Sequence, residues 1–440
     1  MKRRYVAMIS AVLCSAMILS ACGNSKKTES IYTGDKTEVP AWQANLDAIS
    51  PSAYADVEGL DLEPGTYISV IGRAGGTPYW DEVKKGVEQA AEDLNESLGY
   101  SGDDKIKVVY NAPDENDNID EMVNILDEEL ARYPDVIAVS SIDESASEVQ
   151  FDLATANGIP IVAFDSGNSY QGIQCICRTD NKEAAKTGVK KLCEAIGDSG
   201  EIALLLNDSV SENGKEREAG VTEEIKANHP DVSVVETIYV DELDQLKRKA
   251  AAEQLGMSAE DLAAAEAGEK MDDAAQTTGT ANGSGTDTAE TSANGDDGTA
   301  AGGTAPTVAE KFEEVKSAAD KMSNEEAVAY YLKKHPELKG IFALNETSTQ
   351  LGIQVLDELD NSDEIQIVGF DAGKEQVKAL EDGELDGLVV QNPFGMGYAA
   401  VIASARTVLE IGNEAEVNTG YVWVTAENMD DADIKPLVYK

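Results

Sequence analysis

A phrase of seven residues occurs twice in the chain, and each copy contains one aspartate. Residues 161–167 read IVAFDSG and residues 367–373 read IVGFDAG. In both copies a short apolar run, typical of a buried parallel strand, is broken by an aspartate and a glycine, with Asp165 in the first and Asp371 in the second. In open α/β sheets, ligands bind outside the carboxyl ends of the strands. The repeat therefore predicts two similar lobes that each offer a carboxylate to a shared cleft.

Other side chains could complete a site for a molecule with many hydroxyl groups. Tyr79 and Trp80 follow a Gly-Gly-Thr-Pro turn, and an aromatic face stacks on the apolar C–H face of a sugar ring. Carboxylates accept hydrogen bonds, an arginine donates through a planar fork, and side-chain amides do both. The candidate ligand-binding residues are Thr77, Tyr79, Trp80, Asp165, Ser166, Arg217, Asn345, Asp371 and Gln391.

Structural roles remain open for several of these residues. Asp165, Asp371 and Asn345 could each cap the N-terminus of a helix. Arg217 lies in a highly charged segment and could pair with a neighbouring glutamate at the surface. One of the two aromatic rings could belong to the core.

The elements that must position these residues alternate between strand and helix patterns. This alternation is typical of right-handed βαβ crossovers and parallel sheets, so we expect an α/β fold. The predicted strands cover 66–72, 106–110, 136–140, 159–164, 173–178, 201–206, 232–240, 340–344, 365–370 and 385–390. The predicted helices cover 79–98, 119–132, 181–196, 213–228, 324–334, 347–359, 374–380 and 396–411, with one more ending at 156.

The motifs, taken in order, resemble those of the sugar-binding proteins of bacterial ABC importers, of the ribose-binding type. The resemblance covers about 66–244 and 323–424. It rests on GTPYW at 76–80, the two aspartate phrases, TDN at 179–181, KEREAG at 215–220, FALNE at 342–346 and QNP at 391–393. It implies the type I periplasmic-binding fold, with two similar Rossmann-like lobes joined by a three-strand hinge that closes on the ligand.

The same resemblance places the lobes and their crossings. It implies crossings near Thr179, Gln391 and Tyr421. The N-terminal lobe would comprise 66–179 and 392–420, and the C-terminal lobe 180–391 and 421–440. Ser166 stands where ribose binders often carry an arginine, and Glu346 where aspartate is usual, so ribose itself is in doubt while the sugar class is not.

Two parts of the chain, residues 1–65 and 245–322, have different predicted roles. Lys2, Arg3 and Arg4 precede an apolar stretch and the sequence LSAC, which predicts a lipoprotein signal over 1–22 with lipid attached to Cys22. Residues 23–65 are predicted to form a stalk or linker, although 41–62 has apolar residues that could pack on the body. Residues 245–322 are predicted to be a largely disordered insertion with helical flanks at 246–267 and 308–322.

The strongly acidic composition excludes some classes of binding partner. The formal net charge of -48 argues against nucleic acid and anionic membrane surfaces as partners, because both need lysine and arginine to displace counterions.

The acidic stretch 114–118 resembles a calcium loop but lacks glycine at the sixth position and glutamate at the twelfth. Both histidines lie at helix ends, and the cysteines Cys175, Cys177 and Cys193 are predicted to be buried free thiols. We expect no cofactor and no metal.

The sequence therefore predicts a receptor that captures a monosaccharide and delivers it to the permease subunits of an ABC importer. The alternative is a sensor of the same fold that feeds a membrane signalling receptor. The chain has no Ser-His-Asp order and no phosphate-binding loop, so we do not expect an enzyme. The exported start and the missing helix-turn-helix exclude a transcription regulator. The protein is expected to be a monomer, exported and held at the outer face of the cell membrane by its lipid.

Overall fold

The computed structural model describes residues 40–439 apart from 144, 278–306 and 361, and the described residues from 41 onward form one compact unit. The predictions for the signal, for Cys22, for 23–39 and for the centre of the insertion lie outside the described residues. No helix in the described part of the chain is long and apolar enough to cross a membrane.

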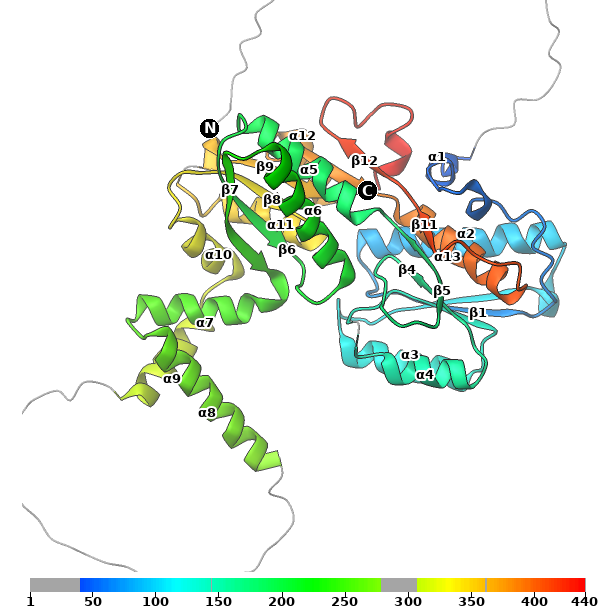
Figure 1. Cartoon of the computed structure of the whole chain (residues 1–440), viewed down its shortest axis with the longest axis horizontal. Coiled ribbons are helices and arrows are strands. Elements are labelled where there is room, and N and C mark those ends of the chain that lie inside the picture. Colours follow the sequence, from blue (N-terminus) through cyan, green and yellow to red (C-terminus); the bar gives the residue numbers. More distant parts are fainter. Residues whose placement is uncertain (1–39, 144, 278–306, 361, 440) are drawn as a thin grey trace, which may run out of the picture. The chain divides into compact units, whose positions relative to one another are not determined.

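Two six-stranded sheets form the framework (Figure 1). The first has the order β11-β5-β4-β3-β1-β2, with all its strands parallel. The second has the order β12-β10-β9-β8-β6-β7 and is parallel except for β12, which pairs antiparallel with β10. The first sheet comprises β1 (Tyr67–Ile71), β2 (Lys107–Asn111), β3 (Val136–Val139), β4 (Ile161–Phe164), β5 (Ile173–Arg178) and β11 (Glu416–Asn418). The second comprises β6 (Gly200–Leu206), β7 (Val232–Tyr239), β8 (Leu338–Ala343), β9 (Gln366–Phe370), β10 (Gly387–Gln391) and β12 (Tyr421–Val424).

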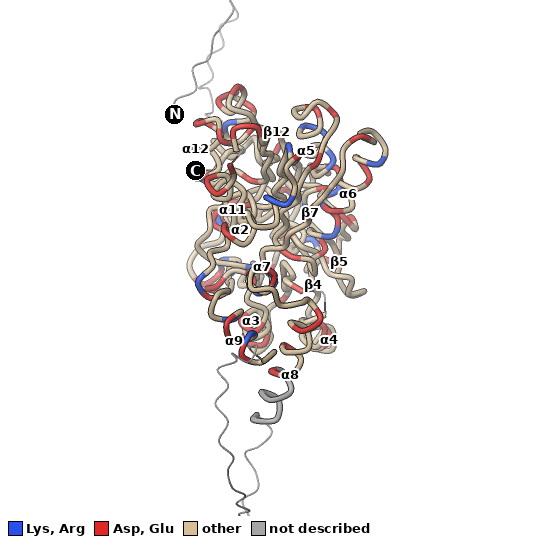
Figure 2. The backbone as a smooth tube through the Cα atoms, turned by 90° about the vertical axis from the view of Figure 1, so that its left-hand side faces the viewer, with Lys and Arg blue, Asp and Glu red and all other residues tan. Residues whose placement is uncertain are grey.

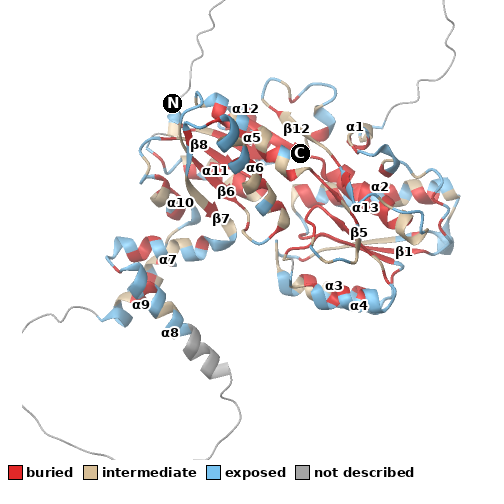
Figure 3. Ribbon diagram, in the orientation of Figure 1, coloured by how far each residue is buried: buried red, intermediate tan, exposed pale blue. Residues whose placement is uncertain are grey.

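Helices cover both faces of each sheet, as crossover connections require. Those of the N-terminal lobe are α2 (Pro78–Leu98), α3 (Ile119–Ala131), α4 (Glu148–Ala156) and α13 (Pro393–Val408). Those of the C-terminal lobe are α5 (Asn181–Ala195), α6 (Glu212–Asn228), α10 (Asn324–Leu332), α11 (Glu346–Leu356) and α12 (Lys374–Asp382). Buried residues concentrate in the strands and in α13, whereas acidic residues are spread over most elements (Figures 2 and 3).

The chain passes between the two sheets three times. It crosses between β5 and α5, between β10 and α13, and between β11 and β12. These positions agree with the crossings expected near Thr179, Gln391 and Tyr421. The predicted α/β fold of two similar lobes with a three-strand hinge is confirmed.

Glycine allows two helices of the N-terminal lobe to touch along their backbones. A Cβ atom at Gly86 on α2 would lie 1.9 Å from the carbonyl oxygen of Phe394 on α13. A Cβ at Gly397 would lie 2.1 Å from the carbonyl oxygen of Val83. Only a residue without a side chain permits this approach. The contact fixes the start of α2 against the start of α13, and both of these helix starts border the site.

Two segments depart from the sequence-based expectation. Residues 41–65 were predicted to belong to a linker, but α1 (Gln43–Asp47) and the residues after it bury Leu46, Ile49 and Tyr54 in the main core. The alternative that 41–62 pack on the body is therefore the one the structure supports, because these apolar side chains gain more by burial than a solvated linker allows.

The described parts of the insertion are helical. They form α7 (Leu243–Gln254), α8 (Ala259–Thr277) and α9 (Val308–Ala319), of which α8 extends beyond the predicted flank. A separate small core that includes Met257, Leu262 and Phe312 joins these helices. Cys175, Cys177 and Cys193 are buried free thiols, as predicted.

Candidate functional site

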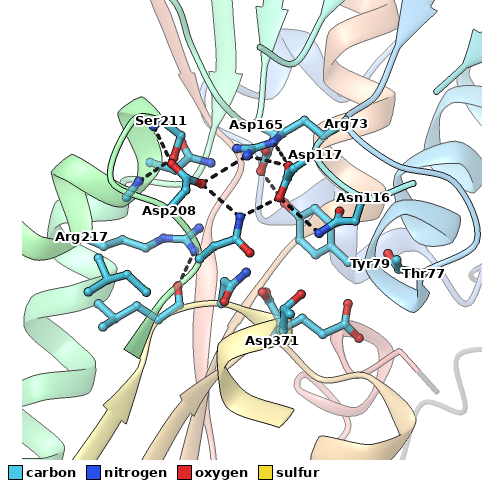
Figure 4. A pocket seen from close by; sticks show the side chains of 18 of the residues that line it. Arg73, Thr77, Tyr79, Asn116, Asp117, Asp165, Asp208, Ser211, Arg217 and Asp371 are labelled. Carbon is cyan, nitrogen blue, oxygen red and sulfur yellow. Dashed lines mark hydrogen bonds and ion pairs between the residues drawn. The ribbon is translucent and has the colours of Figure 1, made fainter. Parts of the chain in front are cut away.

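A cavity of about 90 Å³ lies between the two lobes, at the carboxyl ends of the parallel strands (Figure 4). A cavity needs roughly 10–15 Å³ to hold one water molecule, so this one has room for a small polar ligand. Eight of the nine predicted ligand-binding residues line it: Thr77, Tyr79, Trp80, Asp165, Arg217, Asn345, Asp371 and Gln391.

The two aspartates have the same local geometry in the two lobes. Each follows the last residue of its strand with a left-handed backbone, with φ of 55° at Asp165 and 68° at Asp371. Each donates its backbone N–H to the strand next to it, to the carbonyl of Cys177 at 2.9 Å and of Val389 at 2.8 Å, respectively. Aspartate is among the few residues that adopt this conformation readily. The turn directs both carboxylates to the cavity, so the sequence repeat is also a structural repeat.

The carboxylate of Asp165 is held by groups of its own lobe. The Tyr79 hydroxyl donates to its Oδ1 at 2.8 Å, and the Ser140 hydroxyl donates to its Oδ2 at 3.1 Å. Burial and the nearby Asp165 and Asp371 raise the pKa of Tyr79 well above its usual value, so the phenol remains a neutral donor. No helix begins at Asp165, and the helix-capping alternative is wrong for this residue.

Asp371 is more deeply buried and has fewer partners. Gln391 donates its Nε2–H to Oδ1 at 3.0 Å. Burial raises the pKa of Asp371 to about 6, with a further rise from Asp165, although Arg217 and Gln391 oppose the shift. The cap of α12 is Gly373, so Asp371 does not cap that helix. The carboxylate therefore keeps acceptor capacity for a ligand.

Arg217 points into the protein and not to the surface. Its Nε donates to the side-chain oxygen of Asn181 at 2.9 Å, and its Nη1 donates to the carbonyl of Leu344 at 2.6 Å. The guanidinium also lies over the ring of Phe370, 4.6 Å from the ring centre. These contacts fix the planar fork beside the cavity, and the surface-pairing alternative is wrong.

The remaining predicted residues combine site and scaffold roles. Tyr79 and Trp80 both line the cavity and both belong to the main core, with their rings edge-on at 5.3 Å. Thr77 caps α2 by accepting from the Trp80 N–H, and Asn345 caps α11 by accepting from the Ser348 N–H. A capping role and a place at the cavity are therefore compatible at both helix starts.

Ser166 does not belong to the cavity lining. The residue is fully buried, its carbonyl accepts the N–H of Ser141, and its own N–H donates to the Ser140 hydroxyl. Its hydroxyl oxygen is also buried and has no hydrogen-bond partner among the described residues. The prediction that Ser166 contacts the ligand is not supported by this geometry.

A polar cluster that the sequence did not predict lies at the other side of the cavity. Arg73 contacts Asp117 at 2.7 Å and Asp208 at 3.3 Å through Nη2, and Asn207 donates to Asp117 at 2.7 Å (Figure 4). Burial alone would lower the pKa of Arg73, but Asp117, Asp208 and Asp165 outweigh it and raise the pKa. Arg73 and Asp117 belong to the N-terminal lobe, and Asn207 and Asp208 to the C-terminal lobe. We call these four residues the interlobe cluster.

Only a weak sequence signal points to the interlobe cluster. Arg73 and Asp208 stand two residues after the ends of β1 and β6, which are equivalent strands of the two lobes. Asp117 lies in the stretch that resembles a calcium loop, and its neighbour Asn118 caps α3 by accepting from the Glu121 N–H. In the described residues, no group of three or more histidine, cysteine or acidic side chains could hold a metal ion.

Arg73→Met should weaken the contact between the lobes at the interlobe cluster. The substitution leaves Asp117 and Asp208 facing each other across the cleft without their cation, and their repulsion favours separation. We expect the radius of gyration of the ligand-free variant, measured by small-angle scattering, to increase. The control is Arg132→Met, because Arg132 pairs with Glu128 and Glu129 of its own helix. An unchanged radius of gyration for Arg73→Met would show that the cluster does not hold the lobes together.

Glu346 makes the stability of the folded protein depend on pH. Burial and the neighbouring Asp371 raise the pKa of Glu346 to about 7, with a smaller rise from Glu375 and an opposing effect of the Tyr79 backbone N–H. A carboxyl whose folded pKa is raised binds its proton more tightly in the folded state. Its contribution to stability is therefore present at low pH and lost as pH rises through 7.

Glu346→Gln should remove this dependence. Between pH 5 and pH 8, the free energy of unfolding of the unsubstituted protein should fall by roughly 2–3 kcal/mol relative to that of the variant. Chemical denaturation across this pH range measures the difference, with Glu384→Gln as a control at an exposed position of the same lobe. Parallel stability curves for Glu346→Gln and the unsubstituted protein would contradict the expectation.

Comparison with known proteins places this architecture in a family. A family model described as a periplasmic binding protein domain matches residues 68–267 and 305–410. No curated protein matches the chain.

Several solved structures have a similar fold. A carbohydrate transporter solute-binding protein from Agrobacterium radiobacter, in complex with D-arabinose, has 21% identity and a TM-score of 0.58 over 85% of this chain and 99% of its own. An ABC transporter solute-binding protein from Agrobacterium vitis with bound D-fucose has 20% identity and a TM-score of 0.59, over 84% and 99%. GanP, a glucose-galactose binding protein from Geobacillus stearothermophilus, has 19% identity and a TM-score of 0.58, over 83% and 99%.

The family model covers well over half of the chain, including both sheets' central strands and the residues that face the cavity. The family consists of solute-binding receptors and not of enzymes. The chain belongs to the periplasmic binding protein family.

Proposed function

We propose that the protein is a receptor that binds one small sugar between its lobes and delivers it to the permease of an ABC importer. The observation that carries this proposal is the pair of equivalent aspartates, Asp165 and Asp371, that face one cavity from opposite lobes. Arg217, Asn345 and Gln391 add donors and acceptors around them. This set matches the hydroxyls of a sugar, each of which both donates and accepts.

The aromatic side chains and the structural neighbours support the same class of ligand. Tyr79 and Trp80 offer apolar surface at the cavity, next to the carboxylate of Asp165. Solved structures of similar fold hold D-arabinose and D-fucose. A site built from buried hydrogen-bonding groups rejects analogues that lack the matching hydroxyls, because these groups would then be left unpaired. Selectivity among monosaccharides is therefore expected to be strong.

We also propose that the protein is exported and held at the outer face of the membrane by lipid on Cys22. The support is the sequence of residues 1–22, with its basic start, apolar stretch and LSAC end. Such a tether keeps the receptor near a permease in the same membrane.

Thermal-shift screening of a monosaccharide panel tests the function. A ligand that binds only the native state raises the free energy of unfolding by RT ln(1 + [L]/Kd). The proposal predicts a rise in the unfolding temperature with one or a few closely related sugars. No shift with any pentose, hexose or deoxy sugar would contradict it.

A further inference from the structure

The last described segment of the chain reaches the site from outside the region that the family model covers. This segment, residues 425–439, follows β12 and ends in a short 3-10 turn, Lys435–Leu437, which packs against α1. The family model covers neither this segment nor α1. Met429, Leu437 and Tyr439 are buried, so the segment is anchored to the body.

Tyr439 lies beside Tyr79, which lines the cavity, and near the carboxylates of Asp371 and Glu346. Its ring meets that of Tyr79 edge-on, with the ring centres 6.3 Å apart. Burial, Asp371 and Glu346 raise its pKa well above the usual value, so the phenol stays protonated and can only be a donor toward these carboxylates. Tyr79 belongs to the N-terminal lobe, and Asp371 and Glu346 belong to the C-terminal lobe. Tyr439 therefore contacts the site where the lobes meet.

The hydroxyl of Tyr439 is unusual because it is buried and its O–H has no acceptor at hydrogen-bond geometry among the described residues. The residue is 7% exposed, and its hydroxyl has no hydrogen-bond partner of standard geometry among the described residues, although its oxygen lies near the backbone N–H of Ala372. It nevertheless lies close enough to Asp371 to lower the pKa of that carboxyl. A buried donor without a partner is costly, and a small movement of Asp371 would satisfy it.

We propose that Tyr439 is a positioning residue of the sugar site, which donates a hydrogen bond to Asp371 when ligand is bound. This inference rests on the proposed function. The hydroxyl would hold one carboxylate oxygen from behind and leave the other lone pairs of Asp371 for the hydroxyls of the sugar. The ring would at the same time support Tyr79, whose own hydroxyl orients Asp165. One side chain of the C-terminal segment would thus help to place an acidic group of each lobe.

Tyr439→Phe tests the hydroxyl without removing the ring. We expect the affinity for the best sugar of the panel, measured by calorimetry, to fall about tenfold, which corresponds to the loss of one hydrogen bond to a charged group. Because Tyr439 lowers the pKa of Asp371, the pH below which affinity is lost should move upward in the variant. A purely structural role of the ring would move neither quantity. Tyr439→Ala should lower the affinity further, since the support of Tyr79 is also lost.

Tyr398→Phe is the matched control. Tyr398 is also a buried tyrosine that donates to a carboxylate, Asp93 at 2.9 Å, but it lies between α13 and α2 and away from the cavity lining. This variant should keep the affinity and its pH midpoint. If Tyr439→Phe also keeps both, the inference is overturned while the proposed function stands, because the unsubstituted protein still binds sugar. If the unsubstituted protein binds no sugar, the proposed function fails and the inference fails with it.

Discussion

Asp371→Asn is expected to remove most of the sugar binding and yet to make the ligand-free protein more stable at pH 8. The carboxylate offers charged acceptors to the ligand, and hydrogen bonds to charged groups contribute about 1.5–3 kcal/mol each. The loss of two such bonds lowers the affinity by about 100-fold or more. In the empty protein the same charge is unfavourable, because burial raises the pKa of Asp371 to about 6.

The sign of the stability change follows from that pKa. The folded pKa of Asp371 lies above the ordinary value for aspartate, so its favourable contribution is present below about pH 4 and is lost as pH rises through 6. At pH 8 the buried charge of Asp371 costs about 3 kcal/mol, and the neutral side chain of asparagine does not carry this cost. Calorimetry with the sugar and denaturation without it measure the two effects.

Asp382→Asn is the control, since Asp382 ends α12 in the same lobe and pairs with Lys378 at the surface. The control should change neither the affinity nor the stability by more than a small amount. A variant Asp371→Asn that binds sugar as tightly as the unsubstituted protein would remove Asp371 from the site. A variant that binds weakly and is also much less stable would show that Asp371 has a structural role instead.

The second large effect concerns the scaffold. Gly86→Ala should destabilise the protein by at least about 3 kcal/mol, at the upper end of what overpacking costs. The new Cβ would meet backbone atoms of Phe394 at 1.9 and 2.8 Å, and backbone cannot turn aside as a flexible side chain does. The variant should also bind sugar more weakly, because separating α2 from α13 displaces the helix start that carries Tyr79 and Trp80.

Gly268→Ala is the matched control for this substitution. Gly268 also lies in a helix, α8, but nothing lies within 4 Å of the Cβ that alanine would add. Alanine favours the helix by about 1 kcal/mol over glycine, so this variant should be as stable as the unsubstituted protein or slightly more so. A denaturation midpoint for Gly86→Ala equal to that of the unsubstituted protein would contradict the packing of α2 on α13.

The sequence was sufficient to predict the framework because its signals are local. Apolar runs of strand length, amphipathic helices and the repeated aspartate phrase each report a structure within a few residues. The two aspartates follow from the same reasoning, since a strand that ends in Asp and Gly has a defined turn. The structure confirms this for Asp165 and Asp371, which have the same backbone conformation in both lobes.

The interlobe cluster and Ser166 were not predictable in this way. Whether the residue after Asp165 lines the cavity depends on how the chain turns, and Ser166 is fully buried outside the lining. The cluster joins Arg73 to Asp208, which are far apart in sequence and meet only when both lobes are assembled. Acidic residues are frequent throughout this chain, so one more aspartate after a strand carried little information.

The segments outside the family pattern were also beyond sequence reasoning. Residues 41–65 and 425–439 contain apolar residues without a helix or strand periodicity, and each segment buries a tyrosine, Tyr54 or Tyr439. Their placement depends on long-range contacts such as that between α1 and the 3-10 turn at 435–437. No local pattern reports such a contact.

The most direct test of the central claim is a diffraction structure of the protein with the sugar that stabilises it most. We predict one sugar molecule in the cavity between the lobes, with hydroxyl groups within hydrogen-bond distance of both Asp165 and Asp371. A sugar that binds elsewhere, or that contacts the aspartate of only one lobe, would contradict the account.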